Sequence, residues 1–451
     1  MSAAQADLLL TGGWVVTGDA AGTVISDGAV AVKGNRIAAV GPAARLAGQV
    51  SAGRTIDCAG KAIMPGLIDC HVHTCQQLAR GLADDIPVRE WLEKIVAFES
   101  AMDEEDVRWS ARLACLEMIK SGTTSFIEAC ANPFHVDAVG NCLEESGLRG
   151  VLTRSCMEIP ESDWKTPDAF VMSAEENFTG TARMIERWNG AAGGRIQAWV
   201  GWRQQWNLSD ELLVKIVRLA QEKDVGLHGH LATRRFGQIE HLDRLGVLWP
   251  DMVFAHAIRF TGREIDLIRH YDLKINHNPG ASMHGAYGSA VAGQFPELLE
   301  RGVHVCLGCD GAANNNTLDM FTEMRLASTL HKETRQNAYM ISPRQSLAMA
   351  TRHGAAALRR GDRLGVLAEG RLADIVTVDL AKPHLQPVHD VVSNLVYCAN
   401  GGDVSMTIVD GRILMEDRKV LSLDEKQTME QAGRRAQAIK RRCRQWISRG
   451  E

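Results

Sequence analysis

Two histidines, His71 and His73, stand one residue apart in a stretch that is predicted to be a β-strand. Side chains two positions apart on a strand point to the same face, so both imidazoles can bind one metal ion. The apolar residues 62–64, followed by Pro65 and Gly66, predict a strand and a turn just before this pair. The spacing alone also fits two histidines on a strand surface, so a metal site requires further ligands elsewhere in the chain.

Other side chains that can bind a metal follow later apolar stretches. Each stands where a predicted strand gives way to a polar loop. These strand-end residues are His228, His230, His256, His277 and Asp310. A parallel β/α barrel carries its chemistry at the carboxyl ends of its strands. Imidazole nitrogens together with a carboxylate oxygen suit zinc, and also iron, manganese or cobalt.

Longer motifs along the chain resemble those of the amidohydrolase superfamily, in the branch of cytosine, guanine and S-adenosylhomocysteine deaminases and triazine chlorohydrolases. The motifs occupy residues 65–73 (PGLIDCHVH), 80–85 (RGLADD), 90–92 (EWL), 121–124 (SGTT), 310–315 (DGAANN) and 364–374 (LGVLAEGRLAD). The resemblance covers nearly the whole chain. It implies one divalent metal ion per chain, with zinc preferred and iron or manganese as alternatives. It does not identify the substrate.

The same resemblance assigns roles to individual residues. It implies that the metal ligands are His71, His73, His230 and Asp310, and that His256 orients the attacking water and polarises the substrate. A bound ion lowers the pKa of water from about 15.7 toward about 7. Asp310 is then predicted to accept a proton from that water and to pass it to the departing nitrogen.

One position departs from the pattern of these relatives. Deaminases of this branch carry a glutamate three residues after the metal-binding histidine of the fifth strand, and this chain has Thr233 there. Threonine can hydrogen-bond but has no acidic proton to give to a ring nitrogen. Glu128, at the end of another predicted strand, is the best-placed acid to replace it. Cleavage of a urea, amide or amidine, or displacement on an activated triazine, therefore fits better than the usual deamination of a purine or pterin.

Five residues near the predicted barrel mouth are candidates for substrate contact. They are Gln77, Gln204, Thr233, His277 and Glu128. Glutamine amides, together with the nearby Trp202 and Trp206, suit a planar, neutral, nitrogen-rich compound. Loop polarity and packing are an equal alternative for the glutamines, and a structural role is an equal alternative for His277. His228 is a partner of a metal ligand, a residue that lines the barrel, or itself a metal ligand.

The composition is that of an ordinary globular protein. Of the 451 residues, 45% are hydrophobic and 23% are charged, and no stretch approaches 18 consecutive apolar residues. The net charge of -5 gives no reason to expect nucleic acid or an anionic membrane as a partner. Residues 1–7 lack the basic start of a signal peptide, and the eleven cysteines have no framework spacing. Both features predict reduced thiols and a cytoplasmic protein.

The pattern of apolar residues predicts an α/β protein with a parallel β/α barrel and a small β-sandwich, and the family resemblance implies that the barrel is a distorted (β/α)8 TIM barrel. Short β stretches at both ends of the chain, residues 1–65 and 365–424, are predicted to form one composite sandwich. Between them, residues 66–364 alternate strands with helices, as a parallel barrel does. Residues 425–451 are predicted to be a helical, basic segment.

These features together predict a metal-dependent hydrolase that cleaves a C–N bond in a small heteroaromatic, urea or amidine compound. The chain has no Cys or Ser nucleophile motif and no glycine-rich phosphate loop. A chlorohydrolase or aryl-urea hydrolase is the near alternative. A non-catalytic oligomeric scaffold is the alternative from another class, and the presence of all four implied ligands disfavours it. The resemblance further implies a homodimer or higher homo-oligomer.

Overall fold

The computed structural model of the chain describes residues 4–129, 132–162 and 165–443. These residues form two compact units, which we describe separately. The first unit comprises Met1–Asp69, Glu117–Ser125 and Asp319–Ser422, and the second comprises Cys70–Leu116, Phe126–Leu318 and Leu423–Glu451. The sequence-based boundaries at residues 65, 364 and 424 stay a prediction.

A nine-stranded sheet carries the histidines of interest, in the order β13-β12-β11-β10-β9-β8-β7-β6-β14. Its strands are β6 (Leu67–His73), β7 (Thr123–Glu128), β8 (Arg149–Thr153), β9 (Ile196–Gln204), β10 (Leu227–Leu231), β11 (Met252–His256), β12 (Lys274–His277), β13 (Val305–Leu307) and β14 (Asp310–Gly311). The last two strands come from one stretch of chain, residues 305–311, and pair in parallel with β12 and β6 respectively. The sheet therefore closes on itself, and the prediction of a distorted β/α barrel is confirmed.

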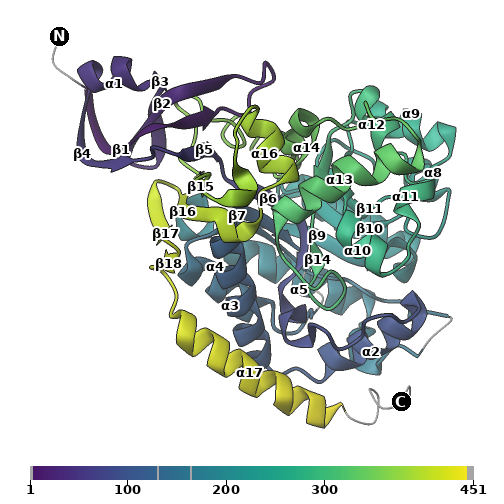
Figure 1. The fold of residues 1–451 in the computed structure, drawn as a ribbon. Coiled ribbons are helices and arrows are strands. Elements are labelled where there is room, and N and C mark those ends of the chain that lie inside the picture. Colours follow the sequence, from purple (N-terminus) through teal and green to yellow (C-terminus); the bar gives the residue numbers. More distant parts are fainter. Residues whose placement is uncertain (1–3, 130–131, 163–164, 444–451) are drawn as a thin grey trace. The chain divides into compact units, whose positions relative to one another are not determined.

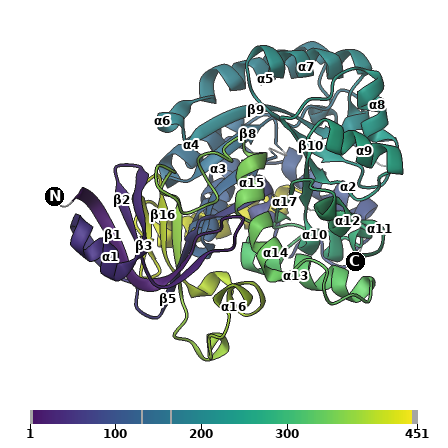
Figure 2. The ribbon, with the colours of Figure 1, turned by 90° about the horizontal axis from the view of Figure 1, so that it is seen from above.

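Helices alternate with these strands along the chain, and Figure 2 shows α5, α7, α8 and α9 following one another around the sheet. They are α2 (Val88–Ser100), α3 (Glu104–Ser121), α4 (Val136–Ser146), α5 (Ala174–Trp188), α6 (Ala191–Gly194), α7 (Asp210–Glu222), α8 (Gln238–Arg244), α9 (Gly262–His270), α10 (Pro279–His284), α11 (Ser289–Ala292) and α12 (Phe295–Glu300). Short 3-10 turns lie at η1 (Thr74–Ala79), η2 (Asp168–Phe170) and η3 (Gln205–Asn207). Helix α7 illustrates why such a segment is helical: Ser209 caps its N-terminus, and its leucines and isoleucine form a buried face.

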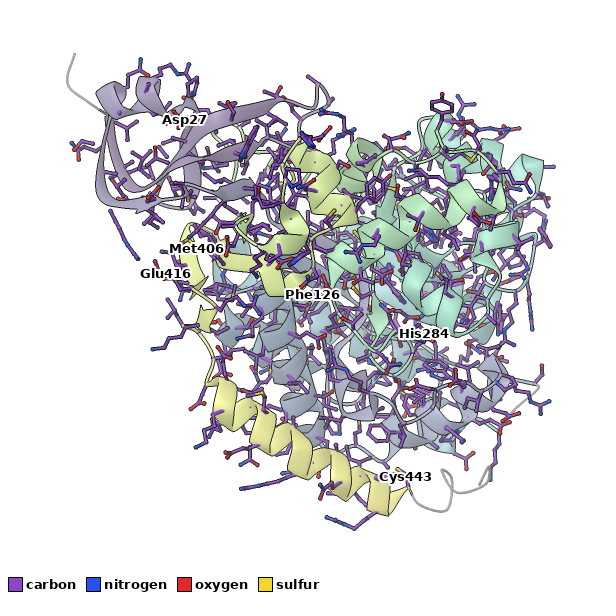
Figure 3. All side chains as sticks on the ribbon, in the orientation of Figure 1. Asp27, Phe126, His284, Met406, Glu416 and Cys443 are labelled. Atoms are coloured by element: carbon purple, nitrogen blue, oxygen red, sulfur yellow. The ribbon has the colours of Figure 1, made fainter. Side chains whose placement is uncertain are left out.

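The barrel strands are apolar along most of their length because both of their faces are covered. Phe126 on β7, labelled in Figure 3, is completely buried, as is Phe254 on β11. Four strands end in a histidine or a glutamate: His73 on β6, Glu128 on β7, His256 on β11 and His277 on β12. These strand ends place chemically capable side chains at one end of the barrel.

The ends of the chain form a second sheet, in the first unit, with the order β18-β17-β16-β15-β5-β1-β2-β3 and with β4 beside β1. Its strands are β1 (Ala4–Val16), β2 (Val24–Lys33), β3 (Arg36–Pro42), β4 (Val50–Asp57), β5 (Lys61–Pro65), β15 (Ile375–Asp379), β16 (Val404–Val409), β17 (Arg412–Glu416) and β18 (Lys419–Val420). The two halves of the chain join where β5 pairs antiparallel with β15. Met406, labelled in Figure 3, belongs to its apolar core.

The remaining helices of the first unit are α1 (Ala43–Gln49), α13 (Met320–Thr334), α14 (Pro343–Met349), α15 (Arg352–Ala357) and α16 (Val391–Tyr397). The long helix α17 (Glu425–Arg442) belongs to the second unit (Figure 1). Its residues Arg435 and Arg442 pair with Asp103 and Asp106 at the start of α3. No helix in the described ranges has a stretch long and apolar enough to cross a membrane.

Candidate active site

His71 and His73 lie at the carboxyl end of β6, beside the strand that carries Asp310. The parallel register sets Asp310 opposite Val72, between the two histidines. Asp310 Oδ1 lies 3.4 Å from His71 Nε2 and 3.3 Å from His73 Nε2. Gly311 allows this arrangement, because a Cβ atom there would lie 1.7 Å from Gln76 Oε1. All three polar groups are almost completely buried.

His230, at the end of β10, completes the cluster. Its Nε2 atom lies 3.2 Å from His73 Nε2. One ligand atom from each of four residues, His71, His73, His230 and Asp310, falls within 4.8 Å of all the others. Gly229 makes room for the ring of Trp202, whose Nε1 donates to the His230 carbonyl at 3.0 Å and fixes the strand end.

The charge states in this cluster suit a divalent ion. Burial lowers the pKa of His71 to about 3 and holds the pKa of His230 well below its usual value. Burial also opposes ionisation of Asp310, but its interactions with His71, His73 and His256 outweigh burial and hold its pKa well below normal. For His73, the hydrogen bond and charge of Asp310 outweigh burial and raise the pKa. His71 and His230 as neutral imidazoles and Asp310 as an ionised carboxylate are already in the states that metal binding requires, whereas His73 would give up a proton when an ion binds.

Comparisons with known proteins agree with this geometry. Residues 62–414 match the model of the amidohydrolase family. The chain belongs to this family. It is 38% identical to the 5'-deoxyadenosine deaminase of Methanosarcina mazei, over 96% of this chain and 99% of that protein. It is also 38% identical to a 5-methylthioadenosine/S-adenosylhomocysteine deaminase of Syntrophobacter fumaroxidans, over 98% of this chain and all of that protein.

Solved structures of other amidohydrolases share the fold over nearly the whole chain. A zinc-bound adenosine deaminase from Xanthomonas campestris has a TM-score of 0.89 and 28% identity, covering 98% of this chain and all of that one. The zinc complex of an atrazine chlorohydrolase from Arthrobacter aurescens has a TM-score of 0.86 and 25% identity, covering 95% of this chain and all of that one. The predicted family, fold and reaction class, metal-dependent hydrolysis of C–N bonds, are therefore confirmed.

The other histidine of β10, His228, contacts the predicted metal ligand His71 on the ring nitrogen that faces away from Asp310. Its Nδ1–H donates to the Val253 carbonyl at 3.1 Å. Burial, together with His71 and His73, lowers the pKa of His228, so its Nε2 atom carries no hydrogen. That atom lies 2.8 Å from His71 Nδ1 and accepts its hydrogen. The chain of two hydrogen bonds thus places the His71 hydrogen on Nδ1, so the lone pair of Nε2 can bind a metal ion beside Asp310.

We expect that replacing His228 by phenylalanine lowers the affinity for zinc by about 10–100-fold, because outer hydrogen bonds of metal-ligating histidines have effects of that size. Competition with a chelator measures the affinity. His228→Gln is the matched control, since its amide oxygen can still accept a hydrogen bond from His71 Nδ1. We expect its affinity for zinc to fall much less than that of the phenylalanine variant. Equal affinities for the wild-type and phenylalanine proteins would contradict this function of His228.

His256, at the end of β11, faces the other oxygen of Asp310. Its Nε2 lies 3.9 Å from Asp310 Oδ2. The Asn278 amide lies 3.2 Å from His256 Nδ1 and holds the ring in this orientation. Burial lowers the pKa of His256, which favours the neutral imidazole. The backbone of His256 has φ 65°, and that of Asp310 φ 63°, both in the left-handed region that non-glycine residues rarely adopt.

A cavity opens in front of these residues. Two of the five predicted substrate contacts, Gln204 and Thr233, line it. Gln204 is there because the register of β9 and β10 places it opposite His230. The other cavity residues come from α2, from the end of β9, and from the 3-10 turns and loops that follow the strands. They are Gln76, Val88, Trp91, Leu92, Glu161, Arg203, Trp206, Arg234 and Tyr287, beside His73, His230, His256 and Asp310.

The other three predicted contacts are absent from the described lining of the cavity. Gln77 Oε1 accepts a hydrogen bond from Arg80 at 2.7 Å. The Glu128 carboxylate accepts from the Thr74 backbone amide at 3.0 Å, and burial raises its pKa to about 7. The His277 ring stacks on Phe295 with ring centroids 3.8 Å apart. Their roles in substrate binding stay predictions.

Sequence reasoning missed Glu161, Trp91 and Tyr287, which line the cavity. Glu161 lies in the long loop after β8, where no strand-end pattern marks it, and its carboxylate accepts from Trp206 Nε1 at 3.0 Å. Trp91 belongs to the EWL motif on α2, and its Nε1 donates to the Ala313 carbonyl at 3.0 Å. That motif was a usable signal for Trp91, since it contributes to the family resemblance.

Proposed function

We propose that this amidohydrolase is a deaminase: it hydrolyses the exocyclic C–N bond of a heteroaromatic amine of the adenosine type and releases ammonia. The observation that carries the proposal is the cluster of His71, His73, His230 and Asp310 at the base of a cavity, with His256 beside the carboxylate. The names of the 38% identical relatives, deaminases of adenosine compounds, support the substrate type.

A divalent ion bound by these four residues would supply Lewis acidity that makes hydroxide available near neutral pH. Asp310 is the proposed base, since its carboxylate is ionised and its two oxygens face the histidine cluster and His256. It accepts a proton from the attacking water and delivers it to the departing amino nitrogen. His256, neutral and held by Asn278, orients the water and polarises the reacting carbon. The products are ammonia and the ring carbonyl compound.

We propose zinc as the ion. Three imidazole nitrogens and one carboxylate oxygen are a ligand set that zinc accepts readily, and iron and manganese are the alternatives. Two structures with the same fold carry zinc. Elemental analysis of the purified protein decides among the three metals.

Planar walls suit the proposed substrate. Trp91 and Trp206 line the cavity, and Gln204 and Gln76 offer amide groups to ring nitrogens and oxygens. We also propose that the enzyme is a cytoplasmic homo-oligomer that binds neither nucleic acid nor membrane, and native mass spectrometry tests its assembly state.

The test is ammonia release by the zinc-loaded protein, followed over 5'-deoxyadenosine, adenosine, guanine, an aminotriazine, chlorotriazines and a phenylurea. We expect ammonia from an aminopurine compound and about one zinc ion per chain. Chloride from a chlorotriazine without ammonia would support the chlorohydrolase alternative. An amine from the phenylurea would support aryl-urea hydrolysis, and a protein that binds no metal would contradict the whole proposal.

A further inference from the structure

Tyr287 places a phenol at the wall of the cavity, close to the proposed base. It follows α10 in the loop before α11 and lines the cavity together with His256 and Asp310. Its ring meets the ring of His256 edge-on, with centroids 5.4 Å apart. This packing fixes the direction in which the hydroxyl group points.

The hydroxyl oxygen of Tyr287 accepts a hydrogen bond, but its hydrogen is not donated to any described residue. Asn314 Nδ2 donates to the Tyr287 oxygen at 3.0 Å and to Asp310 Oδ2 at 3.3 Å. Both amide hydrogens of Asn314 are therefore engaged, and one amide group links the phenol to the carboxylate. Among the described residues, this donation by Asn314 is the hydrogen bond that the phenol makes. The O–H hydrogen therefore remains available to an acceptor that enters the cavity.

A second hydroxyl lies on the same wall. Thr233 lines the cavity, and its Oγ1 atom is buried without a hydrogen-bond partner in the described structure. Arg259 ties the two residues together, because its Nη1 donates to the carbonyl of Thr233 and, at 3.2 Å, to the carbonyl of Tyr287. A buried hydroxyl without a partner is costly, so the Thr233 hydroxyl, together with the undonated hydrogen of the Tyr287 phenol, points to a polar ligand in the cavity.

We propose that Tyr287 donates a hydrogen bond to an acceptor atom of the substrate ring next to the carbon that loses its amine, with Thr233 as a weaker second donor. This inference rests on the proposed function and deepens it: the substrate must carry an unprotonated ring nitrogen or a carbonyl oxygen at that position. A compound without such an acceptor, such as a simple aniline, is excluded.

The hydrogen bond acts where charge develops. When the water oxygen bonds to the ring carbon, the π electron pair of the C=N bond moves onto the ring nitrogen. Tyr287 stabilises that nitrogen while keeping its own proton. Asp310 carries one water proton to the amino group, the C–N bond breaks, and the electron pair on the ring nitrogen re-forms the C=N bond. The remaining water proton then moves from the new hydroxyl oxygen to the ring nitrogen, which gives the ring carbonyl product. Burial raises the pKa of Tyr287, which agrees with a phenol that donates a hydrogen bond rather than a proton.

Tyr287→Phe tests the proposal, because it keeps the ring against His256 and removes only the hydroxyl. We expect kcat for ammonia release from 5'-deoxyadenosine, or from the best member of the panel, to fall about 10²–10³-fold. KM should stay within about threefold, and zinc content and thermal stability should not change. Tyr339→Phe is the matched control, since Tyr339 is 93% exposed and outside the described lining of the cavity. Thr233→Val should lower kcat less than Tyr287→Phe does.

Three results would overturn the inference. A kcat for Tyr287→Phe within threefold of the wild type would remove the catalytic hydrogen bond and leave the proposed function intact. A loss of kcat that follows a loss of bound zinc or of thermal stability would assign Tyr287 a structural role only. Failure of the wild-type enzyme to release ammonia from any panel compound would overturn the proposed function, and this inference with it.

Discussion

Replacing Asp310 by asparagine is expected to lower kcat by about 10³–10⁴-fold. The carboxylate is almost completely buried, and its oxygens face His73 Nε2 at 3.3 Å and His256 Nε2 at 3.9 Å. An amide of the same shape keeps a neutral oxygen near the metal site but cannot accept a proton from the attacking water. Removal of a general base costs up to about 10⁴-fold, and Asp310 also acts in the second proton transfer to the leaving amine. Steady-state ammonia release measures the loss.

A loss of activity in this variant could come from loss of the base or from loss of the metal, and a second measurement separates the two. Zinc content is measured on the same preparation, because the three histidines should retain most of the metal when only one ligand is weakened. Asp266→Asn is the matched control: its side chain is 74% exposed, it lies on α9, and it should keep full activity. A loss of less than about tenfold in a variant with one zinc per chain would contradict the assignment of Asp310 as the base.

The strand-end residues could be predicted because their position depends on local pattern alone. An apolar run followed by histidine or aspartate marks the end of a buried strand, and parallel strands bring such ends together. His71, His73, His230 and Asp310 gather in this way. The partnership of His228 with His71 needed the structure, because it depends on which face of β10 meets β6 across the barrel.

The positions of cavity residues that lie in loops could not be predicted from the sequence as those of the strand-end residues could. After β6 the chain turns into the 3-10 helix η1, where neighbouring side chains point in different directions, so Gln76 lines the cavity while Gln77 bonds to Arg80. Tyr287 stands between Ala286, whose φ is 50°, and Gly288, whose φ is 88°. Left-handed backbone on both sides of a residue is set by tertiary contacts, and the sequence carries no periodic signal for it.

The missing glutamate at Thr233 made deamination less favoured from sequence than cleavage of a urea or amidine. The structure brings Thr233 and Tyr287 to the same wall of the cavity through Arg259. A donor that sits far away in sequence can therefore perform a task that one motif position performs elsewhere. When a chain lacks a residue that its relatives have at a motif position, the sequence shows only that this residue is absent. The surrounding structure shows whether another residue can take its place.

A buried network behind the cavity joins helix α2 to strand β9. Glu99 is completely buried, and its Oε2 atom accepts from Arg203 Nη1 at 3.1 Å. Its Oε1 atom accepts from Gln76 Nε2 at 2.7 Å. Both Arg203 and Gln76 line the cavity. One carboxylate therefore neutralises a buried guanidinium and holds a cavity amide in place.

Replacing Glu99 by alanine is expected to lower the free energy of unfolding by about 3–5 kcal/mol, because it leaves the buried charge of Arg203 without this carboxylate. Urea unfolding followed by tryptophan fluorescence measures the change. Glu93→Ala on the same helix is the matched control: its pair with Arg89, at 3.7 Å, is exposed, so it should cost less than about 1 kcal/mol. The double variant Glu99→Leu with Arg203→Leu removes both charges and should recover most of the loss. Equal losses for the Glu99 and Glu93 variants would show that burial does not make the Glu99–Arg203 pair important for folding.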